Sequence, residues 1–96
     1  MVLLVEWNHP SLRREDGSLT IGMCDDEDKI IYIREDLDEF MMKKVLCHEI
    51  THAAMFSYNV NLTLDQEEIV ADLIATYGAE IIEMTNKIFN RLRLKK

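Results

Sequence analysis

The sequence has few cysteines, no long apolar run and a shortage of positive charge. Its 96 residues contain only two cysteines, Cys24 and Cys47, which are too few for a disulfide framework. No apolar run approaches the length of a membrane span, and no N-terminal stretch combines a basic start, an apolar segment and a small-residue cleavage site. These absences predict a cytoplasmic protein with no membrane association, whose thiols are reduced.

Basic residues are outnumbered by acidic ones. Eleven Lys and Arg residues stand against 18 Asp and Glu residues, for a formal net charge of −7. Such a surface repels phosphates, so nucleic-acid binding is not expected. Four of the basic residues lie at the C-terminus, where residues 91–96 form a basic tail without any acid. This tail either complements a helix C-terminus and is solvated, which we favour, or is a docking arm for an acidic partner.

The first third of the chain is strand-like and the rest is helical. Apolar residues run together at 2–5, alternate with other residues at 19–24 and return at 30–33, which predicts about three strands within residues 2–34. The acidic segment 25–28 predicts a hairpin turn between the last two strands. Strands followed by helices indicate an α+β fold, with an antiparallel or mixed sheet. A chain of this length forms one compact domain, 1–96.

Two helices are predicted after the strands. Asp36 and Glu39 have the spacing of a capping box ahead of a helix at about 37–58. Thr63 and Gln66 repeat that spacing ahead of a second helix at about 64–90. The connection between them is short, so the two long helices are expected to be antiparallel.

The first predicted helix carries the strongest chemical signal, the H-E-x-x-H pattern of residues 48–52. Residues four apart lie on one helical face, so His48 and His52 can both point at one ion. Glu49 is rotated by about 100° from His48 and lies beside the metal, where a general base for water belongs. The histidines emerge from an apolar stripe, where unpaired imidazoles are costly. The pattern predicts a zinc site.

A third metal ligand must come from another segment. Glu67 and Glu68 lie at the start of the second predicted helix. Glu68 and Asp72 share one stripe of that helix, so Glu68 can reach the metal while Asp72 accepts a hydrogen bond from a ligand histidine. Glu67 is rotated away from Asp72, and we therefore favour Glu68 as the ligand. Alternatively, both glutamates are helix-start acids that complement the helix dipole.

The two helical motifs together resemble a known signature. The segment 48–52 followed by 68–72 is similar to the H-E-x-x-H and E-x-x-x-D motifs of gluzincin metallopeptidases, and the E-x-x-A-D-x-x-A form of 68–75 resembles the compact ImmA/IrrE-type metallopeptidases of phages and mobile elements. The resemblance covers roughly residues 19–80. It implies a small twisted sheet packed on two antiparallel helices, and a peptide or protein substrate extended along a sheet edge.

The resemblance also implies roles for individual residues. It implies zinc bound by His48, His52 and Glu68, with Glu49 as base and proton shuttle. Larger relatives carry a further subdomain, for which this chain has no room. They also place a Tyr or His to stabilise the oxyanion; Tyr58 and Tyr77 are candidates by residue type, although Tyr77 is predicted on the far side of its helix from Glu68.

These residues predict zinc-dependent hydrolysis of peptide bonds. Zinc lowers the pKa of its bound water, and Glu49 takes the proton and delivers it to the leaving amine. One alternative is a zinc-stabilised interaction or regulatory module without activity, in which Cys24 or Cys47 closes the fourth zinc position. Another is a self-inhibited, latent peptidase whose cleft is covered by the basic tail or another segment. His9 is predicted to be a surface loop residue.

Overall fold

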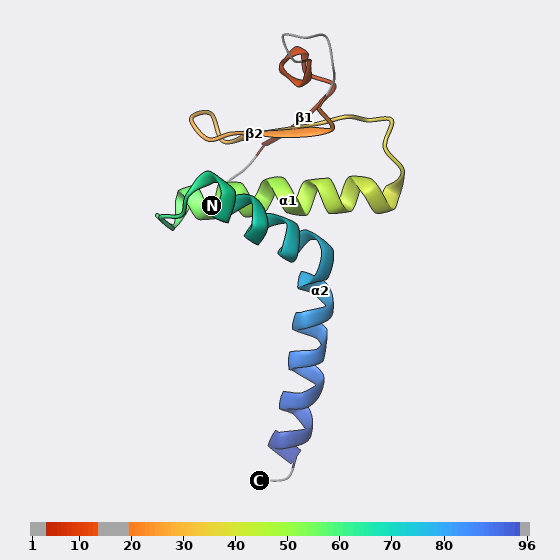
Figure 1. The fold of residues 1–96 in the computed structure, drawn as a ribbon. Helices are drawn as coiled ribbons and strands as arrows, with labels where there is room; N and C mark the ends of the chain where they lie inside the picture. Colours follow the sequence, from red (N-terminus) through yellow and green to blue (C-terminus); the bar gives the residue numbers. More distant parts are fainter. Residues whose placement is uncertain (1–3, 14–19, 95–96) are drawn as a thin grey trace.

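The computed structural model describes residues 4–13 and 20–94. Across these residues the chain forms three strands, one 3-10 turn and two α-helices (Figure 1). The strands are β1 (Leu4–Trp7), β2 (Gly22–Asp25) and β3 (Ile30–Ile33), and the turn η1 (Pro10–Leu12) lies between the first two. The helices are α1 (Glu39–Ser57) and α2 (Leu64–Leu94). The predicted α+β fold is confirmed, although Leu19, which the strand pattern included, lies outside the described residues.

The sheet is mixed, with the strand order β1-β3-β2. β2 and β3 form the predicted antiparallel hairpin, with Cys24 opposite Ile31, while β1 pairs with β3 in parallel. The acidic turn is stabilised by the Asp25 carboxylate, which accepts hydrogen bonds from the amides of Glu27 and Asp28. Because β3 is the central strand, its residues Ile31 and Ile33 are fully buried. β2 is left at one edge of the described sheet.

Helix α1 begins two residues later than predicted. Asp38, not Asp36, is the N-cap, and its Oδ1 accepts a hydrogen bond from the Met41 amide at 2.7 Å. The capping box predicted for Asp36 is therefore wrong, and the Asp36 carboxylate instead pairs with the Arg34 guanidinium. The helix ends where Asn59 adopts a φ of 56°. That left-handed residue lets the Val60 amide donate to the Met55 carbonyl at 2.9 Å.

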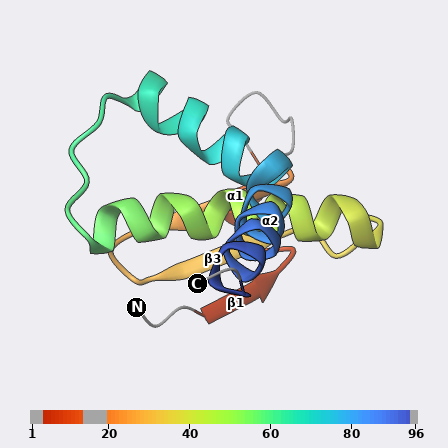
Figure 2. The same cartoon turned by 90° about the horizontal axis from the view of Figure 1, so that it is seen from below.

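The capping box predicted at the start of α2 is confirmed. The Gln66 amide donates to Thr63 Oγ1 at 3.2 Å, and the Thr63 amide donates to Gln66 Oε1 at 3.1 Å. From there α2 runs back obliquely across α1 and then turns away from it, as Figure 2 shows from below. The helix continues to Leu94 rather than ending near residue 90, so Arg91 and Arg93 of the predicted basic tail lie in its last turn.

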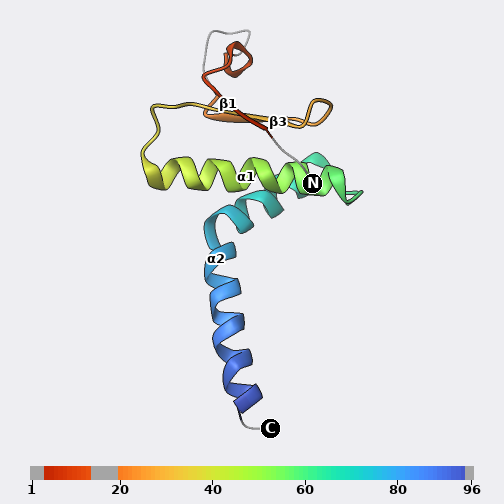
Figure 3. The same ribbon diagram turned by 180° about the vertical axis from the view of Figure 1, so that it is seen from behind.

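Helix α1 lies between the sheet and the first half of α2 (Figure 3). It therefore buries residues on more than one side: Val45, Ala53 and Met55 are buried, and so are the polar residues Glu49 and Thr51. The hydroxyl of Thr51 donates to the Cys47 carbonyl at 2.8 Å, which satisfies it inside the core. No helix in the described ranges is long and apolar enough to cross a membrane.

Candidate metal centre

The crossing of α1 and α2 brings three predicted metal ligands together. The Nε2 atoms of His48 and His52 lie 3.0 Å apart. The Glu68 carboxylate faces both of them, with Oε1 2.9 Å from Nε2 of His52 and Oε2 3.4 Å from Nε2 of His48. One donor atom from each of the three residues lies within 4.8 Å of the others. This group is able to hold a metal ion.

The other nitrogen of each imidazole faces a further carboxylate. Nδ1 of His48 lies 3.0 Å from Oδ1 of Asp72, and Nδ1 of His52 lies 2.6 Å from Oε1 of Glu67. A carboxylate only accepts hydrogen bonds, so each contact favours a proton on Nδ1 and leaves the Nε2 lone pair directed toward Glu68. The donor set consists of two neutral imidazoles and one carboxylate, and a carboxylate orients each ring through its Nδ1 atom. This set fits zinc.

The contact of Asp72 with a histidine agrees with the sequence prediction, but the contact of Glu67 was missed. On its own helix Glu67 is rotated away from Asp72, so the sequence predicted that it lies away from the site. Because α2 runs back across α1, its earlier residues meet the later histidine, so Glu67 reaches the outer side of His52 while Asp72 reaches His48. The short connection between the helices was the available signal for this pairing, because a helix that runs back meets the later histidine with its earlier residues.

Acidic neighbours alter the protonation of His52. Burial lowers its pKa, but the hydrogen bond with Glu67 and the charges of Glu68 and Glu49 outweigh burial, so the pKa of His52 is raised above its ordinary value. The surrounding carboxylates therefore attract positive charge to this position. A divalent cation supplies that charge without a proton.

Glu49 lies beside the donor group rather than in it, as the motif predicts. Its side chain is buried, with 8% of the residue exposed, on the side of α1 that faces the sheet. Burial raises the pKa of the Glu49 carboxyl, and the neighbouring His48 and His52 offset part of that rise. A carboxyl with a raised pKa is a stronger proton acceptor than an exposed glutamate, which suits a general base.

Gly22 allows strand β2 to lie close to Glu49. A Cβ atom built at position 22 would lie 2.4 Å from Cγ1 of Val45 and 3.4 Å from Cγ of Glu49. With any larger residue, the Val45 side chain or the strand would have to shift, since real Cβ atoms do not approach so closely. Glycine at this position thus sets the distance between the edge strand and the metal centre.

A cavity of about 310 Å³ opens beside His48 and Glu49. One wall is the edge strand and the residues before it, and the other is α2 at Asp72 and Ala75. The strand wall consists of Thr20, Ile21 and Gly22, and α1 contributes Met41, Lys44 and Val45 beside the two site residues. The cavity places solvent next to the buried carboxyl of Glu49.

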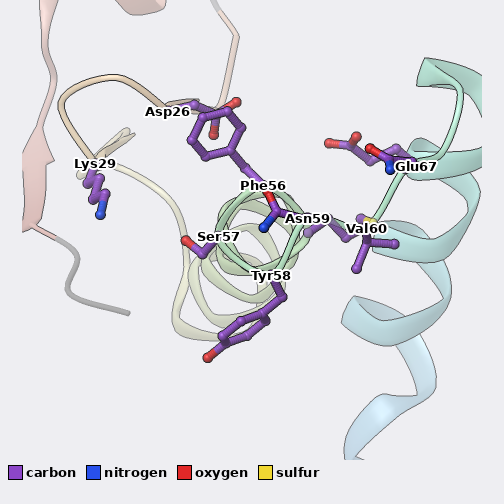
Figure 4. Close-up of a pocket in the computed structure, with 10 residues that line it drawn as sticks. Asp26, Lys29, Phe56, Ser57, Tyr58, Asn59, Val60 and Glu67 are labelled. Atoms are coloured by element: carbon purple, nitrogen blue, oxygen red, sulfur yellow. The ribbon is translucent and has the colours of Figure 1, made fainter.

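A second cavity, of about 620 Å³, lies at the C-terminal end of α1 (Figure 4). The end of α1 and the following loop form one side, and Asp26 and Lys29 of the hairpin turn form another. Figure 4 shows Phe56 projecting between that turn and Glu67, whose carboxylate also holds His52. This cavity therefore reaches Glu67, which contacts His52, but none of the three donor residues lines it.

The remaining candidate residues lie outside the donor group. Among the described residues, the group contains no cysteine. Cys24 donates its thiol to Oδ1 of Asp26 at 3.5 Å, and burial together with that neighbour raises its pKa to about 12. His9 stacks on the ring of Tyr32, with 4.2 Å between centroids. Tyr58 borders the second cavity and Tyr77 is 53% exposed; neither is among the described residues that line the first cavity.

Comparison with known proteins gives one match. The model of a peptidase family described as the IrrE N-terminal-like domain matches residues 7–90. No curated protein and no solved structure matches the chain. The matched range contains both helical motifs and β2 and β3, so it includes every residue of the donor group and the carboxyl of Glu49.

Proposed function

Because the chain belongs to the IrrE N-terminal-like family of peptidases, we propose that it is a zinc-dependent endopeptidase. The observation that carries this proposal is the convergence of His48, His52 and Glu68 beside a buried glutamate at an open cavity. In this proposal the three residues hold zinc, and Glu49 is the general base. When bound, zinc acts as a Lewis acid that acidifies water and polarises a carbonyl group.

The protein's own residues have distinct tasks in the proposed reaction. Asp72 and Glu67 hold the two imidazoles in one tautomer and orientation, so that ligand geometry is set before the metal binds. The buried carboxyl of Glu49 accepts the proton of the attacking water and returns it to the amine that leaves. The apolar surroundings of Glu49 favour both transfers, because they raise the pKa of its carboxyl.

An extended peptide suits the space around the centre. Among the described strands, β2 is at the sheet edge, and an extended substrate can add to such an edge through backbone hydrogen bonds. The cavity beside His48 and Glu49, together with the second cavity beyond Glu67, would give room for chain on each side of the cleaved bond. This arrangement supports cleavage within a peptide rather than at its end.

The principal alternative is a zinc site that has a structural role only. Such a site is closed by a fourth protein ligand, whereas a catalytic site keeps one position for water. The donor group contains no fourth side chain among the described residues, and the thiol of Cys24 is held by Asp26. These observations favour the peptidase over the interaction or regulatory module.

The decisive experiment replaces Glu49 by Gln and measures zinc content and peptide cleavage separately. We expect Glu49→Gln to retain one zinc per chain while cleavage of an unstructured peptide library, followed by mass spectrometry, falls by at least about 100-fold. Glu68→Gln is the matched variant, and it should lose both zinc and cleavage. Cleavage retained in Glu49→Gln would refute the role of Glu49, and a zinc-loaded wild type that cleaves no peptide would support the structural alternative.

A further inference from the structure

The second half of α2 makes no contact that buries it within the described part of the chain. Every residue from 79 to 94 is exposed, and the packing of α2 is against α1 through its first half. Figure 1 shows this half projecting from the body of the molecule. The radius of gyration is 16.2 Å, whereas a compact domain of about 100 residues has about 13 Å. A projecting helix of this length is not stabilised by tertiary packing.

The projecting helix is nevertheless strongly amphipathic. At about 100° per residue, its large apolar side chains other than Leu94 fall on one face and its polar side chains on the other. We call the apolar face the α2 stripe; its members are between 47% and 61% exposed, and they are Tyr77, Ile81, Ile82, Met84, Ile88, Phe89 and Leu92. An exposed apolar face of this extent marks an interaction surface.

The α2 stripe is large enough for a specific interface with a second copy. A half-exposed large side chain carries about 50 Å² of apolar surface, so two stripes offer roughly 700 Å². Since interfaces are about 60% apolar, the total buried surface is roughly 1,100 Å². This value exceeds the approximately 1,000 Å² that a biological interface requires.

The charges beside the stripe are arranged in a self-complementary order. Glu80 and Arg91 lie along one edge of the stripe, the acid earlier and the base later, whereas Glu83 and Lys87 pair with each other on the polar face, 3.9 Å apart. In an antiparallel pair, this edge faces the same edge of the second copy in reverse, so the acidic half of each helix meets the basic half of the other. In a parallel pair, this edge would face the other edge of the stripe, which carries Asn86 and Arg93 and offers no acid to Arg91.

We infer that the α2 stripe is the interface of an antiparallel homodimer whose two-fold axis passes near Thr85. About this axis Gly78 faces Leu92 of the second copy, a small residue against a large one, and Ile81 faces Phe89, which brings two apolar side chains together. The Thr85 hydroxyl donates to the Ile81 carbonyl at 2.8 Å, so it needs no partner at the axis. Helices that bind a membrane surface are rich in Lys and Arg on the polar face, whereas between residues 79 and 94 two glutamates stand beside three basic residues.

Sedimentation of the full chain tests the dimer. We expect twice the chain mass of 11.3 kDa at micromolar concentrations. Ile81→Lys with Ile88→Lys should weaken dimerisation by at least about 100-fold, since two central apolar contacts per copy become buried charges. The matched control, Thr76→Lys with Asn86→Lys on the polar face, should remain dimeric. Unchanged zinc binding and helical circular dichroism would show that both variants are folded.

A charge exchange tests the antiparallel orientation. Glu80→Arg should weaken the dimer several-fold because it places like charges together, and adding Arg91→Glu should restore it. A wild type that stays monomeric at all concentrations, including one that binds anionic phospholipid vesicles as a monomer, would overturn the inference. So would a dimer that survives the double lysine substitution, and the absence of rescue would overturn the antiparallel arrangement.

Discussion

The Nδ1 atom of His52 lies 2.6 Å from Glu67, and the Nε2 atom of the same ring lies 2.9 Å from Glu68. Consecutive glutamates therefore contact the two nitrogens of one imidazole. Because only Glu68 shares the donor group with His48, Glu67 acts by orienting the ring.

Glu67→Ala should lower zinc affinity by about 10- to 100-fold, because loss of the acceptor frees the His52 ring to rotate and to change tautomer. Competition with a chromogenic chelator measures this affinity. Asp65→Ala is the control, since Asp65 is an exposed acid in the same first turn of α2. Equal affinities for the two variants would mean that the contact with Glu67 does not orient the ligand.

Glu49→Gln should make the metal-free protein more stable at pH 7. Burial raises the pKa of Glu49 in the folded state, so ionisation favours the unfolded chain. The penalty is absent below the unfolded pKa, increases as pH rises toward the folded pKa and is constant above it. Removing a buried functional charge typically yields on the order of 1 kcal/mol, which raises the Tm of a chain this short by about 4–8 °C.

Thermal unfolding in the presence of a chelator, at pH 7 and at pH 4, measures the effect of Glu49→Gln. The difference from wild type should shrink at pH 4, where both proteins are uncharged at this position. Glu27→Gln, in the exposed hairpin turn, is the control and should leave the Tm unchanged. A lower Tm for Glu49→Gln at pH 7 would contradict the cost assigned to this buried carboxylate.

Gly22→Ala should destabilise the metal-free protein by about 1–3 kcal/mol, because the added Cβ overlaps Cγ1 of Val45. Val45→Ala alone also destabilises it, since Val45 is a core residue. In the double variant, the smaller side chain at position 45 makes room for the methyl group added at position 22, so the two costs should be less than additive. Urea unfolding of the wild type, the two single variants and the double variant measures this coupling in the free energy of unfolding. Additive costs would show that the contact with Val45 is not what excludes a larger residue from position 22.

Asp38→Ala should destabilise the protein by about 1 kcal/mol, because the Met41 amide loses its acceptor at the start of α1. Asp36→Ala should have no measurable effect, since Asp36 makes only an exposed ion pair with Arg34. Chemical unfolding of the two variants compares the two caps directly. If Asp36→Ala lowered the free energy of unfolding more than Asp38→Ala does, Asp36 would be the cap, as the sequence pattern predicted.

The Cys24 thiol should react slowly with iodoacetamide at pH 8. Its pKa is raised from 9.0 to about 12 by burial and by Asp26. The thiolate is the reactive form, so three pH units lower the reactive fraction by about 1,000-fold. The rate is measured with Cys47→Ser, which leaves one thiol, in the folded protein and in urea. Equal rates in the two states would show that the thiol is neither buried nor held by Asp26.

The sequence determined the features that depend on local spacing. His48 and His52 are four residues apart and Glu68 and Asp72 are four residues apart, so each pair occupies one helical face in any fold that forms the helices. The same local logic predicted the cap of Thr63 and Gln66 and the hairpin of β2 and β3. Local spacing did not identify which aspartate caps the first helix, because both Asp36 and Asp38 precede it.

Only the tertiary structure decided which atoms meet across elements. The angle at which α2 crosses α1 brings Glu67 to His52, and rotation about one helix axis cannot reveal a contact between two helices. The close approach of Gly22 buries Glu49, although no pattern links these residues in the sequence. The α2 stripe also remained hidden, because periodicity shows that a helix has an apolar face but not whether anything covers it.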